Sequence, residues 1–362
     1  MDFQHNEDRQ ILTSSLNRLL ADRHGVEARN AVAFDAKGFS PELFAELAGL
    51  GVIGALFGED AGGFGGDGLD VMVVFEALGR GLSTEPFLGA LMAGVALEAA
   101  GRTDELAGVI SGETIIAFAH DEPEQSTALT GAEPTEDGFR LTGSKAVVDH
   151  AEAADLLLVS AEVPGEGRQL FLIPVDAEGV RIIGYTTIDG GRSGDVHFDN
   201  VAVDAGARLK GDGAAYIDLS LAAGRLALSA EAIGAMDRIR EDTLGYLQTR
   251  VQFGVPIGKF QALQHRMATM LLEIEQARSA VINAALAFGA SPRERDRAVS
   301  AAKYTAGRIG TLVAEEAIQM HGGIGMTWEL AMPHYAKRLI MLDHRLGDED
   351  WHLQRYIALG RA

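Results

Sequence analysis

The chain has 362 residues, of which 47% are apolar and 23% are charged, which is the composition of a globular protein with a large core. It contains no cysteine, so disulfides, thiolate metal sites and cysteine nucleophiles are excluded. Its formal net charge of -21 argues against nucleic-acid binding, because a phosphate backbone would be repelled. A phosphate-bearing cofactor is still compatible with this charge, since it needs only local donors.

Residues 1–113 are expected to form mostly helices, because apolar residues between Ile11 and Leu20 recur at helical spacing and Ser40-Pro41 has the form of a helix start. The N-terminus has neither the basic nor the apolar region of a signal peptide, and no apolar run reaches membrane-spanning length. We therefore expect a soluble, cytoplasmic protein without membrane insertion.

From residue 114 to residue 205 the pattern changes to short segments rich in β-branched or aromatic residues, bounded by Gly, Asp and Pro. Such segments predict a small antiparallel β domain. Helical spacing returns from residue 206 to residue 362, and we expect helices at about 212–251, 258–289, 292–320 and 332–358.

The order of these blocks predicts an α+β fold that is mostly α. We expect three domains, namely a helical domain at 1–113, a small β-barrel or sandwich at 114–205 and a four-helix bundle at 206–362.

Two glycine-punctuated segments in the last block carry the chemistry, at residues 250–261 and 319–329. Arg250 presents a planar fork of donors suited to a pyrophosphate. Gly322 and Gly323 leave backbone N–H groups unobstructed for a phosphate or ribityl chain. In an alternative interpretation without a cofactor, the second segment is only a helix C-cap and Arg250 is a surface ion-pair partner.

The whole layout resembles the acyl-CoA dehydrogenase family from end to end. The resemblance implies an acyl-CoA dehydrogenase fold with FAD bound mainly by the neighbouring subunit, and an acyl-CoA as substrate. The residues of this chain that match the two family patterns R-x-x-F-G-x-x-I-x-x-F-Q and Q-x-x-G-G-x-G, and that would complete the FAD site across an interface, are Arg250, Phe253, Gln261, Gln319, Gly322 and Gly323.

The middle block departs from the family. Family members usually carry T-E-P-G-A-G-S-D, whose small residues touch the flavin, where this chain has Asp121-Glu-Pro-Glu-Gln-Ser-Thr127. The family's W-I-T run, which backs the flavin ring, corresponds here to Lys145-Ala-Val-Val-Asp149. Carboxylates in place of a donor-rich glycine loop should weaken flavin binding, so this chain's own flavin-facing half is expected to be degraded.

The resemblance also implies a carboxylate base, which removes the α-proton while the β-hydrogen leaves as hydride to the flavin. Most family members place a Glu between the last two helices, and aligning Arg355 with the family's Arg puts Asp348 there, shorter by about 1.5 Å. Asp348 is equally well read as an exposed acidic loop residue. A second family position for the base is Gly224 here, whereas Arg225 keeps the register of the substrate-contacting Arg.

A metal site is not expected, since there is no cysteine and His321, His344 and His352 do not form a His-x-x-x-His pair on one helix.

The chain thus keeps the segments that act on a neighbour's FAD and has lost part of what would hold its own. This asymmetry resembles the small subunits of bacterial α2β2 acyl-CoA dehydrogenases, of the pimeloyl-CoA dehydrogenase small-subunit type. It implies a heterotetramer with a paralogous subunit that supplies the flavin face and the base, breakdown of fatty acids or steroid side chains, and an electron-transfer flavoprotein as acceptor. The alternatives are a self-sufficient homo-oligomer with Asp348 as base, and a non-catalytic paralogue that acts as a structural partner.

Overall fold

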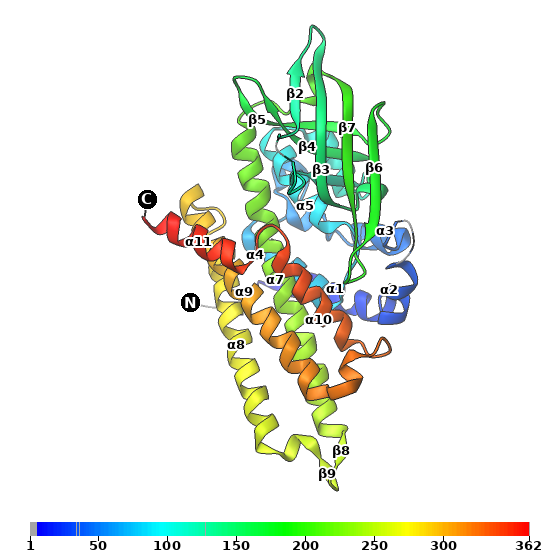
Figure 1. Ribbon diagram of the computed structural model, residues 1–362, viewed down its shortest axis with the longest axis vertical. Coiled ribbons are helices and arrows are strands. Elements are labelled where there is room, and N and C mark those ends of the chain that lie inside the picture. The colour runs from blue at the N-terminus through cyan, green and yellow to red at the C-terminus, as the bar shows by residue number, and fades with distance from the viewer. Residues whose placement is uncertain (1–5, 34, 36, 127, 362) are drawn as a thin grey trace. The chain divides into compact units, whose positions relative to one another are not determined.

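The computed structural model describes residues 6–33, 35, 37–126 and 128–361, and the ribbon is shown in Figure 1. Residues 1–5 and Thr127, on which parts of the sequence analysis rest, lie outside these ranges. The chain divides into two compact units. The bundle unit comprises the described residues of Met1–Ala28, Asp67–Ser83 and Arg225–Ala362, and the sheet unit comprises those of Arg29–Gly66 and Thr84–Gly224.

The bundle unit is built from long helices and carries both glycine-punctuated segments. Its elements are α1 Glu7–Arg23, α4 Gly68–Arg80, α7 Gly213–Thr249 from Arg225 onward, β8 Val251–Gln252, β9 Val255–Pro256, η5 Ile257–Lys259, α8 Gln261–Leu286, α9 Pro292–His321, η6 Gly322–Met326, α10 Met332–His344 and α11 Glu349–Arg361.

The helix boundaries follow local chemistry. Ser291 caps α9 by accepting from the N–H of Glu294, and Pro292 occupies the first turn, where no N–H is needed. The expected helix at 332–358 is wrong as a single helix, because α10 and α11 are separate. Leu346 and Gly347 both have positive φ, at 56° and 100°, and two consecutive left-handed residues end a right-handed helix.

The sheet unit holds one seven-stranded sheet with short helices. Its elements are α2 Val26–Ala33 from Arg29 onward, α3 Pro41–Gly49, η1 Gly54–Leu56, η2 Glu59–Ala61, α5 Phe87–Ala99, α6 Thr103–Ile110, β1 Ile116–Ala119, β2 Gly131–Pro134, β3 Gly138–Asp149, η3 Ala151–Ala153, β4 Leu156–Val163, β5 Gly167–Pro174, β6 Val180–Thr186, β7 Arg192–Asp204 and η4 Ala205–Ala207.

The strand order is β1-β4-β2-β3-β7-β6, with β5 paired to the other side of β4. Most pairs are antiparallel, as expected, but β4 pairs parallel with both β1 and β2. In Figure 1, β4 and β5 run across the direction of β3 and β7, so the sheet curls. Buried apolar side chains from β1 to β5 and β7 fill one core, with Phe171 and Leu157 fully buried.

The observed elements confirm the mostly helical α+β fold. All seven of these strands lie within residues 114–205, and helices precede and follow them. The division into three domains at those boundaries stays a prediction. Among the described helices, α7 alone is long and apolar enough to cross a membrane, and 89% of that apolar stretch is buried inside the protein, as in a core helix.

Candidate cofactor and substrate site

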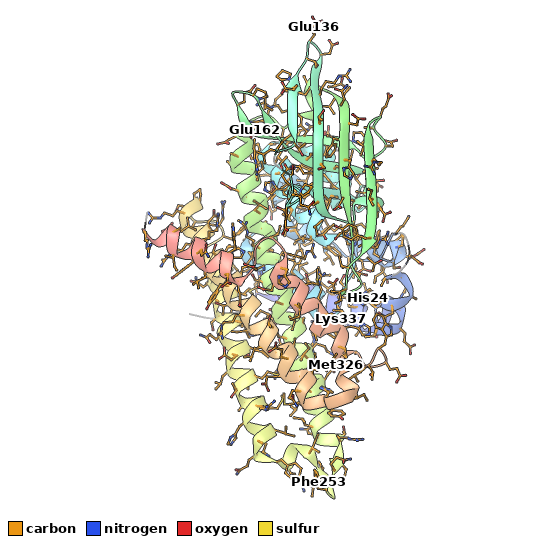
Figure 2. The ribbon with its side chains drawn as sticks, in the orientation of Figure 1. His24, Glu136, Glu162, Phe253, Met326 and Lys337 are labelled. Carbon is orange, nitrogen blue, oxygen red and sulfur yellow. The ribbon has the colours of Figure 1, made fainter. Side chains whose placement is uncertain are left out.

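The segment after α7 forms a small hairpin that projects an aromatic side chain. Strands β8 and β9 pair antiparallel, and the turn between them consists of Phe253 and Gly254, with φ of 53° and 81°. Positive φ at both turn residues is the arrangement that matches the twist of a two-residue hairpin. Phe253 is 90% exposed and lies at the far end of the bundle unit in Figure 2. Phe260 meets it edge to face, with ring centroids 6.1 Å apart.

Arg250 lies at the base of this hairpin. Its N–H donates to the carbonyl of Tyr246 at 2.8 Å, and its own carbonyl accepts from the N–H of Ile257 at 2.9 Å. These bonds fix the backbone on both sides, while the side chain stays exposed. Gln261, also exposed, is the first residue of α8. An apolar pocket of about 510 Å³ borders the hairpin and is lined by Leu244, Leu247, Gln248, Pro256, Gly258, Lys259, Gln264 and Met267.

The second segment begins where α9 ends. Gly322 has φ 65° and ψ -145°, a conformation that side chains rarely adopt, and its N–H still donates to the carbonyl of Ile318. A Cβ placed on Gly322 or on Gly323 would meet nothing within 4 Å, so both face open space. Gln319 is exposed on the last turn of α9. The backbone here is bare enough for a phosphate or a sugar to approach closely.

The two segments meet at one end of the bundle unit. The ring of Tyr246, on α7, stacks on the imidazole of His321, on α9, with centroids 4.5 Å apart and planes 24° apart. Arg250 comes one helical turn after Tyr246, and Gly322 comes directly after His321. The residues that precede Arg250 and Gly322 are therefore in direct contact, which brings the bases of the two segments together. These features fit the FAD that the sequence resemblance implies.

Arg225, the predicted substrate residue, lies at a corner between α10 and α11. Its side chain is 7% exposed, its Nε donates to the carbonyl of Leu346 at 3.0 Å, and its guanidinium lies 4.8 Å from the ring centre of Trp351. Arg225 is thus held at this corner by a hydrogen bond and by a cation–π contact.

Two further buried side chains, Lys303 and His352, hold the same corner. The sequence did not indicate that they act together. Lys303, on α9, donates from Nζ to the carbonyls of Asp343 at 2.8 Å and Gly347 at 3.0 Å. Burial lowers the pKa of Lys303 to about 8. His352 is fully buried, and burial lowers its pKa to about 3, so the ring is neutral. Its Nε2 lies 3.1 Å from the carbonyl of Leu346, which can only accept, so Nε2 carries the proton and donates it. The sequence signal for Lys303 is a lysine inside an otherwise uncharged helical stretch, residues 300–306, which indicates a buried charge.

Asp348, the predicted base, lies at this corner too. Its side chain is exposed, and its Oδ1 accepts from the N–H of Trp351 at 2.8 Å, which makes it the N-cap of α11. The structure therefore brings Asp348 and Arg225 to one corner and gives Asp348 a structural task there. Its role as a base stays a prediction.

In the sheet unit, the loop that replaces the family's glycine loop is closed by a buried ion pair. Lys145 is 1% exposed, and its Nζ donates to Glu122 Oε1 at 2.6 Å, to the carbonyl of His120 at 2.9 Å and to Ser160 Oγ at 3.1 Å. Burial lowers the pKa of Lys145. Thr130 donates to the same carboxylate from its N–H at 3.1 Å and from Oγ1 at 3.0 Å.

The neighbouring backbone is also engaged. The N–H of Ala146 donates to the carbonyl of Asp121 at 2.8 Å, and Val147 has φ 53° at an irregularity of the β3–β7 pairing. In the sequence, the change in this loop is the presence of Glu124 and Gln125 where the family has small residues. The pairing of Glu122 with Lys145 was not foreseen, because the two residues lie on different segments. Glu122 and Lys145 are bonded to one another, and no glycine lies between Asp121 and Ser126.

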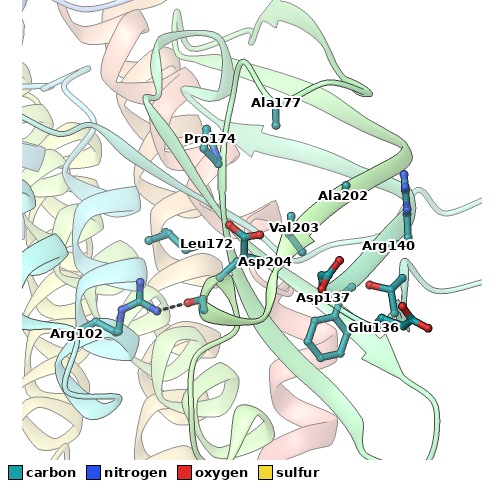
Figure 3. Close-up of a pocket in the computed structure, with 14 residues that line it drawn as sticks. Arg102, Glu136, Asp137, Arg140, Leu172, Pro174, Ala177, Ala202, Val203 and Asp204 are labelled. Atoms are coloured by element: carbon teal, nitrogen blue, oxygen red, sulfur yellow. Dashed lines mark hydrogen bonds between the residues drawn. The ribbon is translucent and has the colours of Figure 1, made fainter.

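The largest of the described pockets, about 740 Å³, lies elsewhere in the sheet unit (Figure 3). Arg102 donates to the carbonyl of Gly206 at 2.9 Å on one side of it, and Glu136, Asp137 and Asp204 make its edge acidic. None of the predicted site residues lines it. Among the described residues, no group of three or more His, Cys, Asp or Glu side chains could hold a metal ion.

Comparison with known proteins gives consistent matches. The family model for the acyl-CoA dehydrogenase C-terminal domain matches residues 211–354, and the model for the acyl-CoA dehydrogenase N-terminal domain matches residues 6–109. Acyl-CoA dehydrogenase IpdE2 of Mycolicibacterium smegmatis is 30% identical over 355 residues, which cover 98% of this chain and 99% of the relative. Acyl-CoA dehydrogenase FadE27 of Mycobacterium tuberculosis is 28% identical over 368 residues, which cover 98% of this chain and 97% of the relative.

Solved structures agree over the whole length. The crystal structure of the ChsE4-ChsE5 complex from Mycobacterium tuberculosis superposes with a TM-score of 0.92 at 27% identity and covers 100% of this chain and 98% of that chain. The Tcur3481-Tcur3483 steroid ACAD G363A variant superposes with a TM-score of 0.90 at 30% identity, with 98% of each chain covered.

Proposed function

Because the chain belongs to the acyl-CoA dehydrogenase family, we propose that it works in FAD-dependent α,β-desaturation of an acyl-CoA, as one subunit of a site completed by a paralogous subunit. The observation that carries the composite site is an asymmetry within this chain. In the bundle unit Arg250 and Gln319 are exposed and the Gly322–Gly323 backbone is uncovered, whereas the loop of the sheet unit is closed by Lys145 and Glu122.

In this proposal the chain's own contribution is to bind and orient the cofactor. Arg250 holds the pyrophosphate through charge-assisted hydrogen bonds, and Phe253 lies against an adenine face. Gln319 and the backbone N–H of Gly323 hold the chain of the cofactor nearer the ring, and Gly322 leaves room for it because it has no side chain. FAD, when bound, supplies the acceptor for the β-hydrogen as hydride.

The closed loop in the sheet unit supports a partner that supplies the flavin face. A flavin edge needs donors, and Lys145 and the N–H groups of Ala146 and Ser126 already donate within the protein. In the proposal the partner is a second acyl-CoA dehydrogenase chain, because the ChsE4-ChsE5 complex and the Tcur3481-Tcur3483 steroid ACAD are each named for two proteins. The Tcur3481-Tcur3483 relative is a steroid ACAD, which supports an acyl-CoA from a steroid side chain as substrate. An electron-transfer flavoprotein is the proposed acceptor of the electrons.

The experiment that tests this proposal is a flavin stoichiometry. The chain is purified alone and after co-expression with a paralogous acyl-CoA dehydrogenase from the same genome, and the visible absorption spectrum is measured. We expect the chain alone to be colourless and the complex to hold one FAD per pair of subunits. One FAD for each chain in the protein purified alone, together with turnover of an acyl-CoA, would show a self-sufficient enzyme instead. A colourless complex would favour the non-catalytic paralogue.

The role of Asp348 separates the two catalytic arrangements. Asp348→Asn keeps an N-cap of equal quality for α11 but removes the carboxylate. If the partner supplies both the flavin face and the base, we expect kcat of the complex to stay within about two-fold of the wild type. Loss of a general base costs about 10²–10⁴-fold in rate, so a loss of this size would make Asp348 the working base. The measurement is steady-state turnover of an acyl-CoA with an artificial electron acceptor.

A further inference from the structure

The stack between Tyr246 and His321 joins the two cofactor segments at their bases. Tyr246 is one turn before Arg250, and its carbonyl accepts the N–H of Arg250 at 2.8 Å. His321 is the last residue of α9 and is followed directly by Gly322. The ring centroids are 4.5 Å apart, so a shift of either helix end is transmitted to the other segment through this contact.

The imidazole is itself held firmly. His321 is 4% exposed, and its Nδ1 lies 2.8 Å from the carbonyl of Ala317, one turn back on α9. Burial lowers the pKa of His321, so the ring is neutral at neutral pH, and Nδ1–H is the donor in this bond. The hydrogen bond to Ala317 therefore fixes the orientation of the His321 ring relative to α9, and Tyr246 stacks on this fixed ring.

The turn after His321 is packed against the same side chain. A Cβ on Gly325 would come within 3.0 Å of the Cβ of His321 and within 3.1 Å of the carbonyl of Ile318. The turn at 322–326 therefore folds back onto His321, while Gly322 and Gly323 face open space. On the other side, the hairpin is tied to α7, because the carbonyl of Arg250 accepts from Ile257.

We propose that Tyr246 and His321 are positioning residues that set the spacing between Arg250 and the Gly322–Gly323 backbone, so that one FAD meets Arg250 with its pyrophosphate and the glycine backbone with the adjoining chain. This inference rests on the proposed function, since it assumes that both segments bind the same cofactor. Neither ring needs to touch the cofactor. Their part is to keep a guanidinium and a bare glycine backbone, which belong to different helices, at a fixed separation.

The test uses Tyr246→Leu, with Tyr246→Phe as the matched control that keeps the ring. Fluorescence titration of the flavin-free complex with FAD gives the Kd. Aromatic pairs contribute enough that Tyr246→Leu is expected to raise the Kd by about tenfold, while Tyr246→Phe stays within about twofold. His321→Leu, which removes the other ring, is expected to match Tyr246→Leu, so the test does not depend on one variant folding.

Amide hydrogen exchange in residues 319–326 of the chain without FAD provides a readout that does not need the cofactor. We expect exchange there to be about tenfold faster in Tyr246→Leu than in Tyr246→Phe. A wild-type complex that binds no FAD would contradict the proposed function, and the exchange experiment would still test the positioning. Folded Tyr246→Leu with unchanged exchange and an unchanged Kd would overturn the inference, as would a lower Tm with both quantities unchanged.

Discussion

Arg250→Ala is expected to weaken FAD binding by the complex by about two orders of magnitude. Arg250 is exposed, but hydrogen bonds to Tyr246 and Ile257 fix its backbone on both sides. The side chain therefore extends from a fixed backbone position. Two charge-assisted hydrogen bonds to a pyrophosphate contribute on the order of 3 kcal/mol, and 1.4 kcal/mol corresponds to tenfold in Kd. The measurement is an FAD titration of the flavin-free complex.

Two variants make this result specific. Arg250→Lys keeps the charge but loses the planar fork, so its Kd is expected to lie between those of the wild type and Arg250→Ala. Arg238→Ala, on α7, removes an arginine that pairs with Asp242 at 3.1 Å, and it should leave FAD binding unchanged. If Arg250→Ala binds FAD within about threefold of the wild type, the hairpin does not hold the pyrophosphate.

Glu122→Ala is expected to destabilise the chain by about 3 kcal/mol, measured as the free energy of unfolding in urea. Removal of one member of a buried pair leaves the other charge uncompensated, which costs about 3–5 kcal/mol. The value here is at the lower end because the Glu122 side chain keeps 16% exposure, whereas Lys145 keeps 1%. Thr130 would also lose the Glu122 oxygens that accept from its N–H and its Oγ1, and only Oγ1 has another acceptor, the carbonyl of Ser144 at 3.2 Å.

The double variant Glu122→Gln with Lys145→Met is the control. It removes both charges, keeps similar volumes and leaves an amide oxygen to accept from Thr130. Replacing a buried ion pair by neutral groups of similar shape is often neutral, so the double variant should lie within about 1 kcal/mol of the wild type. A loss below about 1 kcal/mol in Glu122→Ala would mean that the loop is not held by this pair.

Some features of the structure could be predicted because their causes are local. The period of apolar residues placed the helices and strands in the right order, and Ser291-Pro292 begins α9 through its own cap. Glycine at position 322 is required by a positive φ, which is a property of the residue itself. The cofactor segments were located by such local signals together with the family resemblance.

Other features depend on contacts between residues that are distant in the chain. Periodicity predicted one helix over 332–358, but the chain turns at Leu346 and Gly347, where Arg225, Lys303 and His352 hold the carbonyls of the turn. Helical spacing continues through this region, so periodicity alone hides the break, although the family resemblance places Asp348 between two helices and Gly347 is a residue type that often ends a helix.

The residues that distinguish this chain functionally also depend on contacts between residues that are distant in the chain. The sequence by itself determined the fold, the family and the two segments that present Arg250 and the glycine backbone. Only the tertiary structure decided that Lys145 closes the flavin-facing loop through Glu122, and that Tyr246 meets His321. The physical reason is that a buried charge or ring takes its energy from whichever partner the fold brings within contact distance, and sequence spacing does not encode that partner.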